Sequence, residues 1–307
     1  MTDGFFVLLT AARWAQFLSL FVLFGVLLFP FYVTRAAPAP SGERLALKMR
    51  RAVLIAGAAQ PLSILVWLAA SMASMGDGWS SLRDADFLKA FFFEASFGTI
   101  WLARLSLTIV LVGVLAAARG RLPARNPATA FALGLAGALL ISQAGIGHPA
   151  GLPLGERPIV VAGYALHLLG GAAWIGGLWP LGAILAELQK DDRAQPYVEV
   201  ALGRFATMAS ASVGLLLLGA AINIGPEMAT LKASNPSAWW WAAAMKAVLF
   251  GALIVIACRN RFVLAPSLAI RPREAARDLL RNVIVDQGLA VVLLAVAAFM
   301  GVTSPTG

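Results

Sequence analysis

The chain has 307 residues, of which 60% are hydrophobic and 13% are charged, and its mean hydropathy is +0.82. Soluble globular proteins carry about 25% charged residues, so this chain has too little polar surface for a water-soluble protein. The net charge of +9 does not indicate a nucleic-acid partner, because excess Lys and Arg in a membrane protein mark its cytoplasmic loops and contact lipid headgroups.

Eight apolar stretches are long enough to cross a membrane as helices, which takes about 20 residues each. They lack the alternating pattern of barrel strands, and the connections between them are too short to be soluble domains. The sequence therefore predicts an all-α, polytopic membrane protein in which residues 1–307 form a single transmembrane domain. We expect the helices at residues 5–33, 52–75, 97–118, 128–146, 159–186, 205–224, 238–258 and 283–302.

The distribution of Lys and Arg predicts how these helices are oriented. Of the 24 such residues, 17 lie in the first, third, fifth and seventh connections, and only 4 lie in the second, fourth and sixth. Cytoplasmic loops carry the excess of positive charge, so the odd-numbered connections are expected inside and both termini outside. In a bacterium this orientation would place the termini in the periplasm.

Three basic residues fall within predicted helices: Arg13 in the first, Arg104 in the third and Lys246 in the seventh. A charge inside a membrane normally has a partner. The candidates at similar depth are the carboxylates of Glu94 and Glu227 and the amide of Asn223. We expect ion pairs buried in the outer half of the membrane.

Both histidines lie toward the expected outer side. His148 follows the fourth helix, and His167 lies within the fifth, about 12 Å from its start. An imidazole inside the membrane requires a partner, so His167 is a candidate functional residue. The alternative is a structural role, in which the His167 ring donates a hydrogen bond to a backbone carbonyl. The two histidines can bind one metal ion together if the segment after His148 folds inward. Otherwise they form two binding sites that the ion occupies one after the other.

The fifth helix also carries two pairs of adjacent glycines, and small residues allow membrane helices to approach closely. We therefore expect this helix at the centre of the bundle. The glycines are Gly170, Gly171, Gly176 and Gly177.

Five methionines are expected in the outer half of the membrane. Thioether and imidazole ligands together suit Cu(I), whereas hard cations prefer oxygen ligands. The alternative is that these methionines fill the membrane core. With a single cysteine, Cys258, the chain has no CxxC redox pair and no thiolate zinc cage. The sequence thus predicts a copper site, with Cu(I) favoured over Cu(II), built from His148 and His167 with Met72, Met75, Met228, Met245 and Met300.

Several stretches, in this order, resemble the bacterial copper-resistance protein D family (CopD/PcoD). They are residues 11–17 (AARWAQF), 97–104 (FGTIWLAR), 147–150 (GHPA), 167–169 (HLL) and 174–178 (WIGGL). The resemblance implies an eight-helix, multi-pass protein of the bacterial inner membrane that handles copper. It also implies that His148 and His167 are the characteristic histidines and that a periplasmic CopC-like copper-binding protein is the partner. The first predicted helix lacks the histidine that some relatives have.

We therefore expect a copper transport protein, not an enzyme, that takes copper inward from a periplasm-facing site. The chain contains no nucleotide-binding fingerprint, so transport would follow a gradient or depend on a partner. The alternative is a membrane haem protein or quinone-linked copper reductase, in which both histidines would be axial ligands of one haem. A copper-binding scaffold or sensor is a third interpretation.

Overall fold

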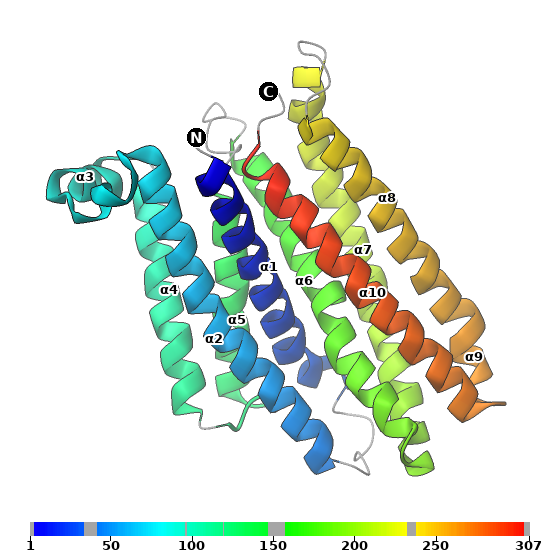
Figure 1. Cartoon of the computed structure of the whole chain (residues 1–307). Helices are drawn as coiled ribbons and strands as arrows, with labels where there is room; N and C mark the ends of the chain where they lie inside the picture. The colour runs from blue at the N-terminus through cyan, green and yellow to red at the C-terminus, as the bar shows by residue number, and fades with distance from the viewer. Residues whose placement is uncertain are drawn as a thin grey trace.

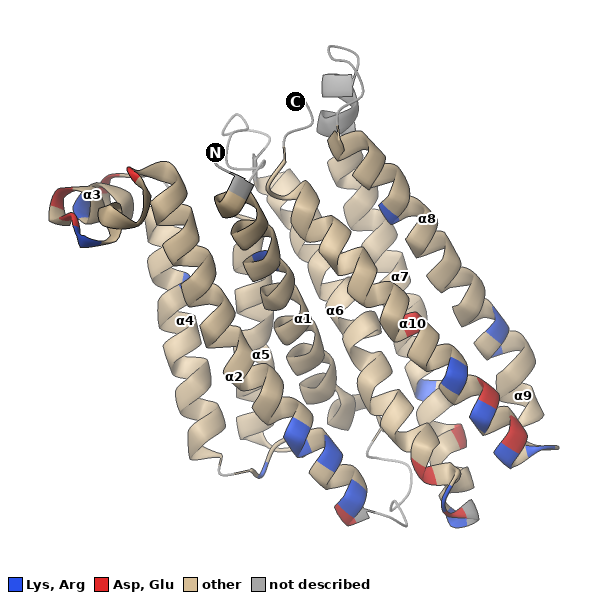
Figure 2. Ribbon diagram, in the orientation of Figure 1, with Lys and Arg blue, Asp and Glu red and all other residues tan. Residues whose placement is uncertain are grey.

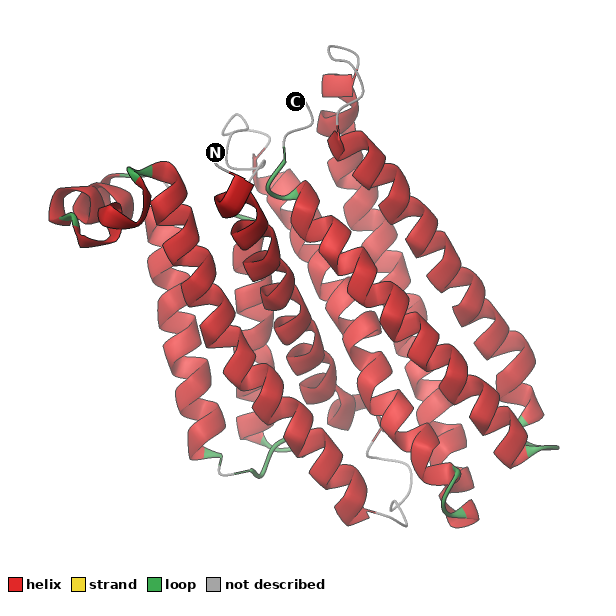
Figure 3. Cartoon of the chain, viewed as in Figure 1, coloured by secondary structure: helices red, strands yellow, loops and turns green. Residues whose placement is uncertain are grey.

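The computed structural model describes residues 3–33, 42–95, 97–118, 120–146, 157–231 and 238–303. Within these ranges it contains helices and no strand, which confirms the all-α class (Figures 1 and 3). Eight long helices form a bundle in this part of the chain. They are α1 (Asp3–Val33), α2 (Gly42–Met75), α4 (Gly98–Ala117), α5 (Pro127–Gln143), α6 (Arg157–Leu188), α7 (Gln195–Leu231), α8 (Ala238–Arg259) and α10 (Pro272–Met300).

Seven of these helices are long and apolar enough to cross a membrane. The eighth, α5, has 17 residues. It is about 26 Å long, slightly less than the hydrocarbon core of about 30 Å. α1 begins and α10 ends at the same end of the bundle, an arrangement that requires an even number of crossings (Figure 1). The chain is a polytopic membrane protein, while the count of eight crossings and the orientation with both termini outside remain predictions.

Several helices extend beyond the apolar stretches that predicted them. α2 begins at Gly42 instead of residue 52, α7 at Gln195 instead of 205, and α10 at Pro272 instead of 283. Charged side chains gather on these extensions, at the lower end of the bundle in Figure 2. Arg, Lys and Glu are good helix formers, so the helix continues where the hydropathy falls. The predicted ranges were therefore too short at this end, which we expect to face the cytoplasm.

Side-chain caps determine where two helices begin. Asn126 accepts a hydrogen bond from the Thr129 N–H at 2.8 Å, and Pro127 occupies the first turn of α5. Asp84 caps α3 (Ala85–Lys89) by accepting from two backbone N–H groups. Together with η1 (Gly78–Arg83) and η2 (Ala90–Glu94), α3 lies beside the Met75 end of α2, at the upper left in Figure 1. The remaining short elements are η4 (Asp192–Ala194), η5 (Asn260–Leu264) and α9 (Ala265–Ser267).

α6 lies at the centre of the bundle, as its glycines predicted. It contacts α1, α5, α7 and α10. Its backbone comes nearest to α1 at Gly25 and Gly176, where a Cβ added to Gly25 would collide with the Gly176 backbone. A Cβ at Gly176 would likewise collide with the Phe21 carbonyl. Only glycine allows this crossing.

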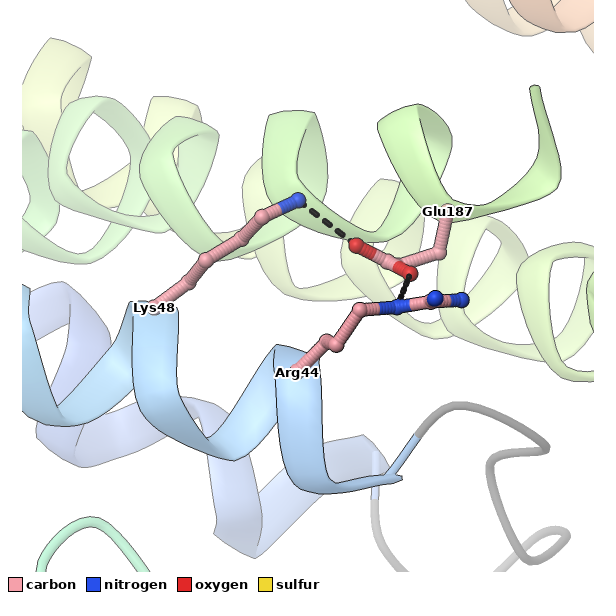
Figure 4. Close-up of polar contacts among 3 residues, drawn as sticks. All are labelled: Arg44, Lys48 and Glu187. Atoms are coloured by element: carbon pink, nitrogen blue, oxygen red, sulfur yellow. Dashed lines mark hydrogen bonds and ion pairs between the residues drawn. The ribbon is translucent and has the colours of Figure 1, made fainter. Parts of the chain in front are cut away.

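A buried carboxylate joins α6 to α2 at the end of the bundle that we expect to face the cytoplasm. The Lys48 Nζ lies 2.6 Å from Oε1 of Glu187, and the Arg44 Nε lies 3.3 Å from Oε2 (Figure 4). The Glu187 side chain is 3% exposed, whereas Lys48 and Arg44 are 38% and 59% exposed. One glutamate on α6 therefore holds two cations of α2.

Candidate functional site

His167 lies half-buried in α6, about 15 Å from the beginning of the helix. Its Nδ1 is 3.0 Å from the carbonyl oxygen of Leu216 on α7. A carbonyl only accepts hydrogen bonds, so Nδ1 carries the proton and Nε2 keeps its lone pair. The sequence analysis left open a structural role in which the His167 ring donates a hydrogen bond to a backbone carbonyl, and this contact is that hydrogen bond. It is also the contact that holds the tautomer and ring orientation of metal-binding histidines.

Glycines bring α6 and α7 together around His167. A Cβ added to Gly219 of α7 would lie 2.8 Å from the His167 N and 3.0 Å from its Cβ. A Cβ added to Gly163 of α6 would lie 2.8 Å from the Asn223 Oδ1. Larger residues at these positions would separate the helices, so the imidazole reaches the Leu216 carbonyl because both glycines are there.

Three polar residues surround this part of the α6–α7 interface. Asn223 is 7% exposed, and its Oδ1 accepts no hydrogen bond from the described part of the chain. Lys246 of α8 is close enough for its charge to act on His167. Tyr164 lies one helical turn from His167 and within electrostatic reach of Arg13. In the sequence, these residues could be recognised as site candidates only as polar groups inside apolar stretches.

The predicted methionine ligands are spread over the bundle. Met72 is 4% exposed and packs in a cluster that includes Trp67 and Trp101. Met75 of α2 and Met245 of α8 are 57% and 53% exposed. Met300 is half-buried at the end of α10. Because α2 and α8 lie on opposite sides of the bundle, Met72 and Met75 do not share an ion with Met245 (Figure 1).

His148 and the side chain of Met228 lie outside the described residues. In the part that the structure describes, no group of three or more His, Cys, Asp or Glu side chains is arranged to hold a metal ion. The described residues therefore offer one imidazole, at His167, with its Nε2 lone pair available to a metal.

Among the described residues, the buried arginines lack a carboxylate partner, contrary to our expectation for Glu94. Arg13 and Arg104 make no ion pair with a carboxylate of a described residue. Glu94, one expected partner, is exposed at the end of η2, and the side chain of Glu227 lies outside the described residues. Both guanidinium groups pack on the ring of Trp67 instead.

Comparison with known proteins relates the whole chain to one family. Residues 1–153 match the family model described as "Copper resistance protein D-like, N-terminal domain", and residues 199–300 match "Copper resistance protein D". His148 lies within the first matched range, and His167 lies between the two.

Two curated relatives cover nearly the full length. "Copper resistance protein D" of Pseudomonas syringae pv. tomato is 26% identical over 306 residues, which is 96% of each chain. "Inner membrane protein YebZ" of Escherichia coli (strain K12) is 26% identical over 299 residues, or 96% of this chain and 97% of the relative. No solved structure matches the chain at a significant level.

Proposed function

The chain belongs to the copper resistance protein D family, and we propose that it carries copper across the bacterial inner membrane from a periplasm-facing site toward the cytoplasm. The inner-membrane location follows from the family, the relative named an inner membrane protein and the seven apolar helices. Copper is the substrate in this proposal, and Cu(I) is the form that the proposed thioether and imidazole ligands suit.

The observation that supports the proposal best is the state of His167. Its Nδ1–H is engaged by the Leu216 carbonyl, so Nε2 is the ring atom that presents a lone pair. This imidazole sits inside an apolar helix, where a polar group without a function would be costly. A copper ion entering from the outer end would meet it after about three turns of α6.

We propose His148 and methionines as the other ligands. His148 precedes α6 in the chain and lies in the connection that we expect on the periplasmic side. Met228 and Met300 belong to α7 and α10, which both contact α6. Met72 and Met75 lie on α2, and Met245 is 53% exposed on α8. We propose that these three methionines bind the incoming ion before it reaches His167.

A site with few strong ligands would bind copper loosely enough to release it inward. Transport would then proceed down the copper gradient, because this sequence contains no nucleotide-binding fingerprint to couple it to ATP. A periplasmic CopC-like copper-binding protein is the proposed donor. The lipid bilayer is the only other partner that the proposal requires.

Copper uptake into proteoliposomes tests this function. The wild type should accumulate copper, and the His148→Ala/His167→Ala double variant should lose at least nine-tenths of the initial rate. Val248→Ala, at a side chain that is 72% exposed on the outside of α8, is a matched control and should transport like the wild type. Equal uptake by the double variant would contradict a histidine-dependent entry site.

An absorption spectrum of the same samples separates the competing functions. A Soret band would favour the haem-dependent reductase. Copper bound without uptake would favour a scaffold or sensor.

A further inference from the structure

Two arginines from different helices lie over the ring of one buried tryptophan. The guanidinium carbons of Arg13 on α1 and Arg104 on α4 each lie 4.8 Å from the centroid of the Trp67 ring on α2. Arg104 also lies 5.4 Å from the ring of Trp101. Both rings are deeply buried, at 3% and 2% exposure. The two guanidinium carbons are therefore no more than twice 4.8 Å apart, close enough for the two positive charges to repel each other.

Stacking on the rings leaves several of the guanidinium donors unused. Arg104 is fully buried, and its Nη1 donates to the Ser142 Oγ of α5 at 3.1 Å. Its Nε and Nη2, and the Nε of Arg13, are buried without a hydrogen-bond partner in the described part of the chain. The guanidinium N–H groups point outward in the plane of the group, so a ring against its face does not satisfy them.

The apolar spans of α1, α2, α4 and α5 supply no negative charge. The sequence contains no Asp or Glu between residues 4 and 42, between 44 and 76, or between 97 and 155, which together cover nearly all of α1, α2, α4 and α5. The ion pairs found among the described residues involve Glu187, Asp191 and Glu274, which lie near the ends of α6 and α10 that we expect inside. Two like charges buried without a counter-charge among the described residues carry a large desolvation cost.

We propose that Arg13 and Arg104 bind a small monovalent anion of the halide class between α1, α2 and α4. The anion would accept hydrogen bonds from the unpartnered Nε and Nη2 donors and neutralise the charge that the helices leave uncompensated. The enclosure by Trp67 and Trp101 favours a single atom over a substituted carboxylate or a lipid headgroup. This site is separate from His167 and does not depend on the proposed copper transport.

Iodide quenching of tryptophan fluorescence tests the site, because a bound heavy anion would lie beside Trp67. Purified full-length protein in nanodiscs is titrated with sodium iodide, with sodium gluconate keeping the ionic strength constant. We expect a saturable quenching component in addition to the linear quenching of the other tryptophans. Chloride should compete for this component, whereas sulfate should not.

Variants assign the saturable component to the site. Trp67→Phe should reduce its amplitude, and Trp67→Phe/Trp101→Phe, which removes both rings beside the site, should abolish it while the linear component of the remaining seven tryptophans persists. Arg104→Gln and Arg13→Gln should each weaken half-saturation by iodide at least tenfold. Trp241→Phe, at a tryptophan that is 72% exposed on α8, is the matched control and should keep the saturable component.

A purely linear dependence on iodide in the wild type would overturn the proposal, as would a saturable component that survives in Trp67→Phe/Trp101→Phe. Bromide soaked into crystals or grids of the wild type gives an independent answer if an arginine variant does not fold. Density for bromide beside the Arg104 Nη2 would support the site. Ordered water alone at that position would refute it.

Discussion

At the scale of single residues, the hydrogen bond between His167 and Leu216 fits both a structural role and a metal-binding role of the histidine. Donation from Nδ1 to the Leu216 carbonyl ties α6 to α7, and it also leaves the lone pair on Nε2. A variant that keeps the first property and removes the second can separate them. Asparagine is such a residue, because its amide nitrogen occupies nearly the position of Nδ1 and it has no counterpart of Nε2.

We predict that His167→Ala and His167→Asn both weaken copper binding at least tenfold, measured by competition with a chromophoric copper chelator. His167→Ala should also lose about 1 kcal/mol of stability with the hydrogen bond, whereas His167→Asn should unfold near the wild-type temperature. Wild-type copper affinity in the asparagine variant would mean that the residue is only structural.

Two buried carboxylates differ in their surroundings. Glu187 holds Arg44 and Lys48, while Asp286 of α10 is 3% exposed and its Oδ1 has no hydrogen-bond partner within the described ranges. Removing the charge should therefore have opposite consequences at the two positions. A paired carboxylate loses its partners, whereas an unpaired one loses its desolvation cost.

We predict that Glu187→Gln lowers stability by about 1–2 kcal/mol, a modest figure because Arg44 and Lys48 are themselves partly solvated. Asp286→Asn should leave the unfolding temperature unchanged or raise it. Thermal unfolding of both variants in the same detergent measures the difference. An equal loss of stability in Asp286→Asn would show that its carboxylate has a partner that stabilises the fold.

At the scale of the helices, glycine determines how closely α1 and α6 cross. The Gly25 and Gly176 backbones are in contact, so these positions have no room for a side chain. Other helical glycines, such as Gly113 of α4, have no atom within 4 Å of the position of an added Cβ. Replacing glycine by alanine therefore causes a collision at Gly176 but meets open space at Gly113.

We predict that Gly176→Ala lowers stability by about 1–3 kcal/mol or more, because the overpacked helices must move apart. Gly113→Ala should be neutral or should stabilise by up to about 1 kcal/mol, since alanine is the better helix former. Unfolding of the two variants in detergent compares them directly. A Gly176→Ala protein as stable as Gly113→Ala would contradict the close crossing.

At the scale of the whole molecule, the charges divide the bundle into two ends. Lys, Arg, Asp and Glu gather at the end opposite the chain termini, with a smaller group on the segment that contains α3 (Figure 2). The apolar middle is the part that fits a bilayer. By the positive-inside rule we expect the strongly basic end to face the cytoplasm, and that orientation can be measured.

We predict that Ser80→Cys, in the exposed η1 segment and a Cys258→Ser background, reacts with a membrane-impermeant maleimide from the periplasm. Cys258, the single native cysteine, lies near the opposite end of α8 and should react only after the inner membrane is permeabilised. The reverse labelling pattern would invert the topology and move His167 toward the cytoplasm.

Most of the architecture could be predicted from the sequence. A membrane helix satisfies its own backbone hydrogen bonds, so a sufficiently long apolar stretch is enough to identify it. The order of short motifs also led to the correct family, and the glycines of α6 predicted its central position. Helix ends were missed where charged residues continue a helix beyond the apolar stretch, as between residues 42 and 52.

The contacts within the bundle were decided only by the tertiary structure. The methionine prediction used depth along each helix, yet Met72 and Met245 lie on opposite sides of the bundle. The Leu216 carbonyl near His167 and the shared ring of Trp67 were equally invisible in the sequence. Hydropathy gives the depth of a residue in the membrane, but its neighbours depend on which faces the helices turn to one another. Small residues such as Gly219 decide those faces through close packing.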